Sequence, residues 1–232
     1  MSNFIISKME LNRQLEVFNP NKFQDKKIDV IGTGATGSYI VWLLTKIGLT
    51  NIRCWDDDKV ESHNVPNQIF RQEIDLEKPK VEALAEMVKQ GAGAEIEVRN
   101  ELYKGQEKLG NIVFLLVDSM AERKKIWDSS IKIKLHVDFM IETRMDIDNG
   151  MIYALDPKHP THIAEWEKTL YSDDEAATSA CGTVLSIAPT ASLIASLAVW
   201  ELIKYFTKPE TVSNEQLLGI RDEFQIVSRK FA

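Results

Sequence analysis

Short apolar runs alternate with longer segments of helical spacing over the first half of the chain. Residues 27–31 form an apolar run that is typical of a buried strand. Residues 36–47 carry apolar positions at helical spacing and stop at Gly48, and a second apolar run occupies residues 51–55. This order predicts a strand, a helix and a second strand parallel to the first.

The same alternation continues to about residue 140. Pro79 stands where a first-turn proline favours a helix, which we expect to run to residue 89. Ser119 and Glu122 have the spacing of a capping box and predict another helix after Asp118. Further strands are predicted at residues 95–99, 111–117 and 135–139. The sheet to this point should be parallel.

The pattern changes after residue 140. A strand is predicted at 150–155, and a polar segment follows at 156–182 with a short helix near 163–169. Long irregular segments in compact domains are often functional. Two short strands, near 217–220 and 224–228, close the chain.

Residues 184–206 are apolar enough to raise the question of a membrane span. The stretch contains Pro189 and Thr190 and ends with Glu201 and Lys204, which argues against a span. We expect a long helix buried in the core or in a subunit interface, and no membrane association.

Together these elements predict one domain over residues 1–232. We expect an α/β, Rossmann-like fold with a mostly parallel central sheet, flanking helices and a C-terminal antiparallel extension. Its nucleotide-binding half should occupy about residues 25–140, and a crossover segment and C-terminal part should occupy about residues 141–232.

Composition narrows the kind of partner. The 35 acidic and 28 basic residues give a net charge of -7, which disfavours a nucleic-acid binder and favours a protein or small-molecule substrate. The N-terminus lacks the basic-then-apolar order of a signal peptide. Cys54 and Cys181 lie far apart with no CxxC pair, so neither a disulfide framework nor a zinc site is indicated. We expect a cytoplasmic protein.

Gly32, Gly34 and Gly37 form a GxGxxG motif between a predicted strand and a predicted helix. In that context the glycines permit a tight turn and close approach of the backbone to a phosphate at the helix N-terminus. Asp56 ends the next strand, where a carboxylate can accept hydrogen bonds from ribose hydroxyls. This combination indicates a nucleotide site, and an NAD enzyme would share it.

The segment WDDDKVESHNVPNQIFRQEIDLEKPKVEAL separates the two interpretations. It resembles the ThiF/MoeB and ubiquitin-activating family, whose pattern is DxDxVxxxNxxRQ followed by PKVEA. The positions that match are Asp56, Asp58, Val60, Asn64, Gln68 and Lys80. The resemblance extends to LLVDSMAERKKI and to CGTVLSIAP, and it covers nearly the whole chain.

The resemblance implies an ATP site in which Asp56 holds the ribose, Lys80 contacts the phosphates and Asp118 helps to hold Mg²⁺. The residue types suit attack of a carboxylate on the α-phosphorus. The nucleophile is already ionised, so catalysis depends on positioning and on neutralising phosphate charge.

The sequence departs from the family pattern in two places. Asn67 stands where the family has the arginine of its RQ pair, and asparagine cannot neutralise a phosphate. Arg71 lies four residues on and would reach back if the segment were helical. The family's frequent CxxC zinc pairs are absent, so we expect no zinc.

Three further residues carry expectations from the resemblance. Cys181 stands where several members carry an acyl persulfide or a thioester, and a small buried residue is an equally good interpretation. Arg13, in ELNRQ, is similar to an arginine that enters the ATP site of the neighbouring subunit, which implies a homodimer. Arg144 would face the acceptor's carboxylate.

The sequence therefore favours ATP-dependent adenylation of the C-terminal carboxylate of a small ubiquitin-like or sulfur-carrier protein that ends in glycines. Pyrophosphate would be released, and the acyl group would then move to Cys181 if that residue is a carrier. One alternative is an NAD-dependent oxidoreductase, which leaves Lys80 and Asp118 without a role. Another is a non-catalytic nucleotide- or partner-binding module, which Asn67 favours. A tRNA-modifying relative is disfavoured by the negative charge.

Overall fold

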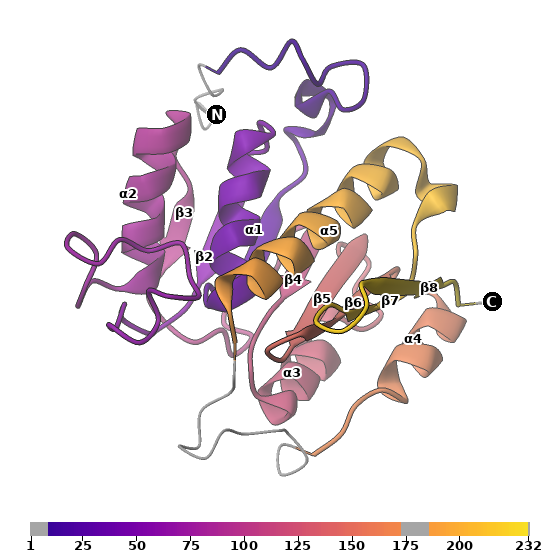
Figure 1. Cartoon of the computed structure of the whole chain (residues 1–232). Coiled ribbons are helices and arrows are strands. Elements are labelled where there is room, and N and C mark those ends of the chain that lie inside the picture. The colour runs from indigo at the N-terminus through magenta and orange to yellow at the C-terminus, as the bar shows by residue number, and fades with distance from the viewer. Residues whose placement is uncertain (1–8, 173–185, 232) are drawn as a thin grey trace.

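The computed structural model describes residues 9–172 and 186–231, and within them eight strands form one sheet (Figure 1). The strands are β1 (Ile28–Ile31), β2 (Ile52–Trp55), β3 (Glu97–Arg99), β4 (Ile112–Leu115), β5 (Phe139–Met145), β6 (Asn149–Leu155), β7 (Glu215–Gly219) and β8 (Gln225–Arg229). The helices are α1 (Ala35–Lys46), α2 (Lys80–Ala92), α3 (Met120–Ile126), α4 (Pro160–Glu167) and α5 (Ala188–Thr207). Short helical turns occupy Pro20–Phe23, Trp127–Ile131 and Pro209–Thr211.

The strand order is β3-β2-β1-β4-β5-β6-β7-β8. Strands β1 to β5 pair in parallel, and β6, β7 and β8 extend the sheet in antiparallel fashion. This arrangement confirms the predicted α/β, Rossmann-like fold and its antiparallel extension. The chain passes from β3 across β2 and β1 to β4, and the crevice beyond the carboxyl ends of β1 and β4 is where open α/β sheets bind ligands.

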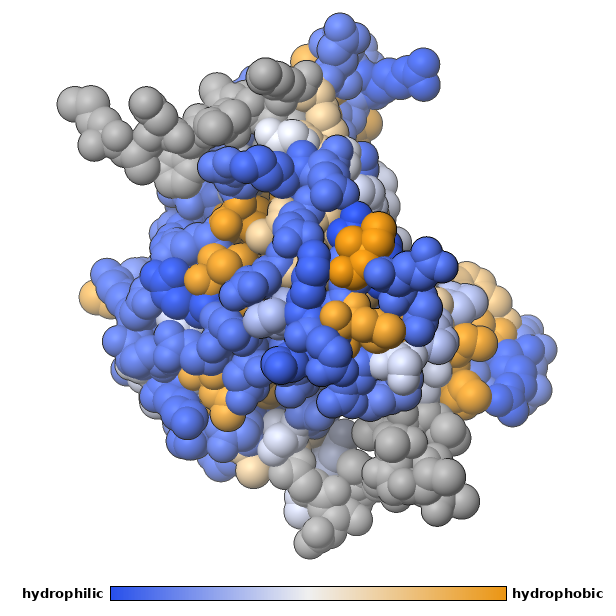
Figure 2. All heavy atoms as spheres, turned by 90° about the vertical axis from the view of Figure 1, so that its left-hand side faces the viewer, coloured by the Kyte–Doolittle hydropathy of each residue, from blue (hydrophilic) through white to orange (hydrophobic). Residues whose placement is uncertain are grey.

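Helices cover both faces of the parallel half, and strands β1, β2 and β4 are accordingly buried along their whole length. Ile28 and Val30 of β1 belong to a core shared with α1, α2 and α5, whereas Ile31 belongs to a second core shared with α3 and α4. The exposed surface over α2 is mostly hydrophilic, and apolar residues lie there in small separate groups (Figure 2). That side therefore presents no broad apolar surface.

The apolar stretch near the C-terminus forms α5, which packs against α1 and the sheet. Its Glu201 is fully buried and accepts hydrogen bonds from Gln216 Nε2 (2.7 Å) and from the Ser213 N–H (2.9 Å). No helix among residues 9–172 and 186–231 is long and apolar enough to cross a membrane.

The strand predicted at 135–139 was placed too early. The segment before Phe139 forms turns, in which Lys134 N–H donates to Ile131 O and Val137 N–H donates to Lys134 O. Leu135 is 88% exposed, so its apolar character does not mark a core position. The strand runs from Phe139 to Met145 instead and carries Arg144 within it.

Candidate nucleotide site

A cavity of about 990 Å³ lies at the carboxyl ends of the parallel strands. Its walls come from the glycine turn after β1, the residues after β2 and β4, the N-terminal residue of α2, α3, and the β5–β6 pair. A cavity of this size accommodates a small organic ligand such as a nucleotide. The sequence motifs that predict a nucleotide site therefore converge on one place.

Two glycines of the turn are required by its packing. Gly32 has a φ of +95°, and a Cβ atom there would lie 2.7 Å from Leu116 O. A Cβ atom on Gly37 would lie 2.1 Å from Gly32 O. Both positions need glycine whether or not a ligand binds.

Gly34 differs from these two. A Cβ atom there would meet no protein atom within 4 Å, and the residue lines the cavity. It precedes the first residue of α1 and makes no side-chain cap, so the helix N-terminus is left for another acceptor. Open space beside an uncapped helix N-terminus fits a phosphate group.

Asp56 follows β2 and is held by the glycine turn. Its Oδ2 accepts hydrogen bonds from the Thr33 N–H (2.6 Å) and from Thr33 Oγ1 (3.0 Å), and its Oδ1 accepts from the Asp58 N–H (3.0 Å). Burial raises the pKa of the Asp56 carboxyl, against the opposing effects of the Lys80 charge and of these N–H donors. The carboxylate is thus fixed at the cavity wall, with lone pairs that suit ribose hydroxyls.

Lys80 is the first residue of α2, and only 7% of its side chain is exposed. Its Nζ lies 2.7 Å from Asp58 Oδ2, and 66% of the Asp58 side chain is exposed. The carboxylates of Asp56, Asp57 and Asp58 each offer an oxygen within 4.8 Å of the others. A buried ammonium therefore lines the cavity with a solvent-exposed carboxylate as its partner.

Asp118 follows β4 and is exposed on the cavity wall. Its Oδ1 accepts a hydrogen bond from the Ser119 N–H (2.8 Å), and Ser119 Oγ in turn accepts from the Glu122 N–H (3.2 Å) at the start of α3. The predicted capping role of Ser119 is confirmed. The exposed carboxylate of Asp118 is a suitable ligand for Mg²⁺.

The turn segment after Asp58 brings three amides to the cavity, Asn64, Asn67 and Gln68. Asn67 Nδ2 donates to Ser186 Oγ. Asn67 Oδ1 and Gln68 Oε1 are buried, and neither accepts a hydrogen bond from the part of the chain that the structure describes. Leaving such an acceptor unpaired costs about 1–3 kcal/mol, so both fit a ligand or water that donates hydrogen bonds.

Nearly the whole sequence matches one protein family. The sequence matches the ThiF family over residues 11–230. The chain belongs to the ThiF family.

Individual relatives cover different shares of this ThiF-family chain. Over 93 residues, 40% of the chain, it is 33% identical to ubiquitin-like modifier-activating enzyme 5 of Caenorhabditis briggsae, of which the match spans only 21%. Over 204 residues it is 22% identical to the sulfur carrier protein ThiS adenylyltransferase of Escherichia coli (strain K12), covering 84% of the chain and 77% of that protein.

Solved structures show the same fold. E. coli MccB superimposes with a TM-score of 0.72 at 16% identity, covering 97% of this chain and 70% of that one. MccB with ATP gives a TM-score of 0.68 at 17% identity, covering 91% of this chain and 65% of that one. The ThiF-family chain thus spans about two thirds of MccB, and identities this low show the fold alone.

Arg71 does not reach back toward Asn67. Its Nε and Nη2 donate to the fully buried Asp75 (2.9 and 2.7 Å), and its Nη1 donates to Gln90 (2.8 Å). Arg71 does not line the cavity. The buried carboxylate one turn along is the nearer anion, and we remove Arg71 from the nucleotide site.

Arg13 does not line this cavity. Arg13 is exposed, and the neighbouring Gln14 donates to Ile47 O (2.7 Å), just past the end of α1 that is opposite to Gly34. Within one chain Arg13 is therefore remote from the site, so its predicted role requires a second copy. Cys181 lies outside the described residues.

Two arginines share one carboxylate at the far end of the cavity. Glu142 is fully buried, and it pairs with Arg123 and with Arg144, whose Nε lies 2.9 Å from Glu142 Oε1. Trp166 Nε1 also donates to Glu142 (3.1 Å). Two guanidinium groups against one carboxylate leave a net positive charge beside the cavity that Arg123 and Arg144 line. Arg144 was expected at the site, whereas Arg123 and Glu142 were missed because they lie on different elements.

Proposed function

We propose that this chain uses MgATP to adenylate the C-terminal carboxylate of a small ubiquitin-like or sulfur-carrier protein that ends in glycines. One observation carries the proposal. A single cavity combines the open position at Gly34, the buried ammonium of Lys80 and the exposed carboxylate of Asp118. Membership of the ThiF family and its similarity to an adenylyltransferase and an activating enzyme support it.

In this proposal each polar group has one task. The N–H groups at the start of α1 receive a phosphate beside Gly34, and Lys80 neutralises phosphate charge after leaving Asp58. Asp56 accepts hydrogen bonds from the ribose hydroxyls. Asp118 would hold Mg²⁺, and the bound ion would supply further charge neutralisation on the phosphates.

The reaction makes one bond and breaks one. An oxygen of the acceptor carboxylate forms a bond to the α-phosphorus, and the bond from that phosphorus to the bridging oxygen of pyrophosphate breaks. The products are an acyl-adenylate and pyrophosphate. Because the carboxylate is already ionised, the residues need not remove a proton, and rate enhancement comes from positioning and charge stabilisation.

The acceptor would enter from the antiparallel side of the cavity. Arg144, Met151 and Tyr171 line that side, and Tyr171 is 40% exposed. The net positive charge of the cluster formed by Arg123, Glu142 and Arg144 favours a carboxylate there. The same charge offsets part of what Asn67 does not provide.

Two parts of the proposal depend on a second copy of the chain and on Cys181. Arg13 would enter the site of a second copy, so the active unit would be a homodimer. The Cys181 thiolate would attack the acyl carbon of the adenylate, forming a thioester and releasing AMP. Cys181→Ala should then spare pyrophosphate exchange and abolish a thiol-linked acceptor on a non-reducing gel, and a thiol-linked adduct that persists would remove Cys181 from the pathway.

A non-catalytic nucleotide-binding module is the second candidate, because the uncharged Asn67 is bonded to Ser186 within the cavity wall. Thermal stabilisation separates these two candidates from an oxidoreductase, and pyrophosphate exchange separates them from each other. Both candidates predict thermal stabilisation by ATP but not by NAD, since a ligand at 100 times its Kd adds about 2.7 kcal/mol. Only the adenylating enzyme should exchange labelled pyrophosphate into ATP when an acceptor is present. Stabilisation by NAD instead would favour the oxidoreductase.

A further inference from the structure

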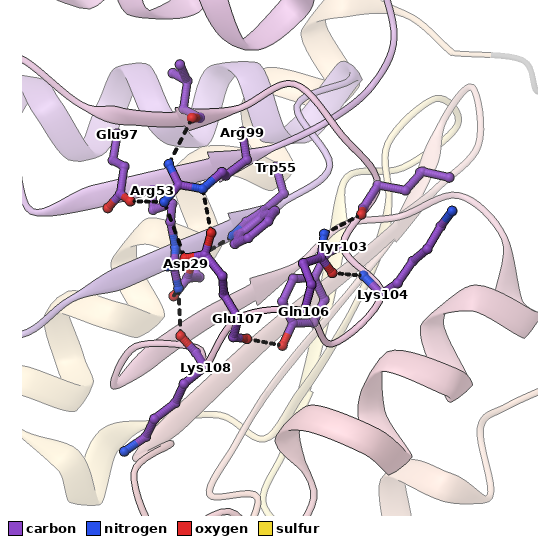
Figure 3. A network of polar contacts seen from close by, with 12 residues as sticks. Asp29, Arg53, Trp55, Glu97, Arg99, Tyr103, Lys104, Gln106, Glu107 and Lys108 are labelled. Carbon is purple, nitrogen blue, oxygen red and sulfur yellow. Dashed lines mark hydrogen bonds and ion pairs between the residues drawn. The ribbon is translucent and has the colours of Figure 1, made fainter.

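Asp29 places a carboxylate in the middle of β1, where it is fully buried. Its two oxygens receive four hydrogen bonds, and Figure 3 shows the side chains of Arg53 and Trp55 that donate three of them. Oδ1 accepts from Arg53 Nε (2.6 Å) and Trp55 Nε1 (2.8 Å), and Oδ2 accepts from Arg53 Nη2 (3.1 Å) and the Gly110 N–H (2.6 Å). A charge in a buried parallel strand is costly, and such complete pairing is what makes it tolerable.

Arg53, on β2, links this carboxylate to the segment 100–111 between β3 and β4. Its Nη1 donates to Glu107 Oε2 (2.6 Å), and its Nη2 donates to Lys108 O (2.8 Å). Glu107 also accepts from Arg99 Nε (2.7 Å). The segment has no regular secondary structure, and these contacts and the Gly110 bond hold it against the sheet together with the burial of Tyr103 and Leu109 in the second core.

The fixed segment carries part of the cavity wall. Leu102 and Tyr103 line the cavity together with Trp55. Tyr103 Oη donates to Glu107 O (2.8 Å), and the Tyr103 ring lies edge-on to Trp55 at 5.0 Å between centroids. Leu102 is 45% exposed although it is apolar. This wall follows the strand next to the one that Asp56 ends, where a base attached to a bound ribose would lie.

We propose that Asp29, Arg53 and Glu107 are positioning residues that hold Leu102 and Tyr103 as the wall against which the nucleotide base packs. The inference rests on the proposed function, because it takes the ligand to be a nucleotide. None of these three residues lines the cavity. Replacing buried ion pairs by apolar residues is often neutral for stability, so stability alone does not account for this network. Holding the segment in one position would account for it.

The network is tested with ligands that do and do not contain a base. Glu107→Ala removes the carboxylate that joins Arg53 and Arg99, and the Glu107 side chain is 37% exposed, so the variant should fold. Its Kd for ATP should rise about tenfold, equivalent to ~1.4 kcal/mol. Inorganic tripolyphosphate has no base, so its inhibition constant against pyrophosphate exchange should stay within about twofold of the wild-type value.

Leu102→Ala, which removes the wall directly, should show the same selective loss. Glu86→Ala is the matched control, because Glu86 pairs with Lys78 on the exposed face of α2, away from the cavity. An unchanged Kd for ATP in Glu107→Ala, or equal losses for ATP and tripolyphosphate, would overturn the inference while leaving the proposed function standing. Failure of the wild-type chain to bind ATP would overturn both.

Discussion

Lys80 Nζ lies 2.7 Å from Asp58 Oδ2, although 7% of the lysine side chain is exposed against 66% of the aspartate side chain. The ammonium is therefore confined to the cavity wall, whereas its partner is free to turn into solvent. An incoming phosphate can replace Asp58 without moving the lysine. The pair keeps the buried charge compensated until the nucleotide arrives.

Lys80→Ala should reduce pyrophosphate exchange by ~100-fold or more, because a preorganised charge partner typically contributes ~3 kcal/mol to the transition state. Asp58→Asn should retain most of the activity, since the phosphate takes over the pairing. Lys78→Ala is the control, as Lys78 pairs with Glu86 at the surface. Near-normal exchange in Lys80→Ala would remove this residue from the ATP site.

The glycines of the turn should respond differently to alanine. Gly37→Ala places a Cβ atom 2.1 Å from Gly32 O and should lower the free energy of unfolding by ~2 kcal/mol or more. In Gly34→Ala the added Cβ atom meets no protein atom within 4 Å, so the free energy of unfolding should stay closer to that of the wild type. The same methyl group should weaken ATP binding. Urea unfolding and titration with ATP measure the two effects, and wild-type ATP affinity in Gly34→Ala would contradict the assignment.

The raised pKa of Asp56 gives a signed dependence of stability on pH. A carboxyl whose pKa is higher in the folded than in the unfolded state stabilises the fold by its protonated form. This stabilisation is fully present below the pKa of the unfolded state and is lost as pH rises through the pKa of the folded state. Asp56→Asn removes this ionisation. Its stability relative to wild type should be greatest near pH 7 and should decline as pH falls through the Asp56 pKa. Urea unfolding between pH 4 and pH 7 checks the sign, since a relative stability that grows toward low pH would refute it.

Arg13 can be tested only between copies. Arg13→Ala and Lys80→Ala homodimers should both be slow. In a reassembled heterodimer one site carries both defects and the other carries neither, so activity should recover toward half that of wild-type dimers. Differently tagged chains verify the heterodimer, and verified heterodimers as inactive as their parents would show that Arg13 does not act in trans.

Local sequence signals predicted the part of the site that depends on strand ends. Gly34, Asp56 and Asp118 follow three parallel strands, and a parallel sheet brings such positions to one edge. Lys80 was also placed correctly at the start of a helix. These positions could be predicted because each depends on neighbours within a few residues and on a topology that the strand–helix alternation specifies.

Contacts between distant segments escaped prediction. Arg71 pairs with the buried Asp75 and does not line the cavity. Sequence spacing alone does not distinguish these two positions for its side chain. The pairing of Arg123 with Glu142 joins α3 to β5. Asp29 would have been a signal, because a charged residue inside an apolar strand needs a partner, but nothing in the sequence names Arg53 as that partner.

The most direct test of the account is incorporation of labelled pyrophosphate into ATP by the full chain, with Mg²⁺ and candidate carrier proteins that end in glycines. We predict exchange that requires the acceptor's free C-terminal carboxylate and that falls by ~100-fold or more in Asp118→Ala, whose fold should be retained. Exchange that is as fast in Asp118→Ala as in the wild type, or as fast with an acceptor amidated at its C-terminus, would contradict the proposed adenylation.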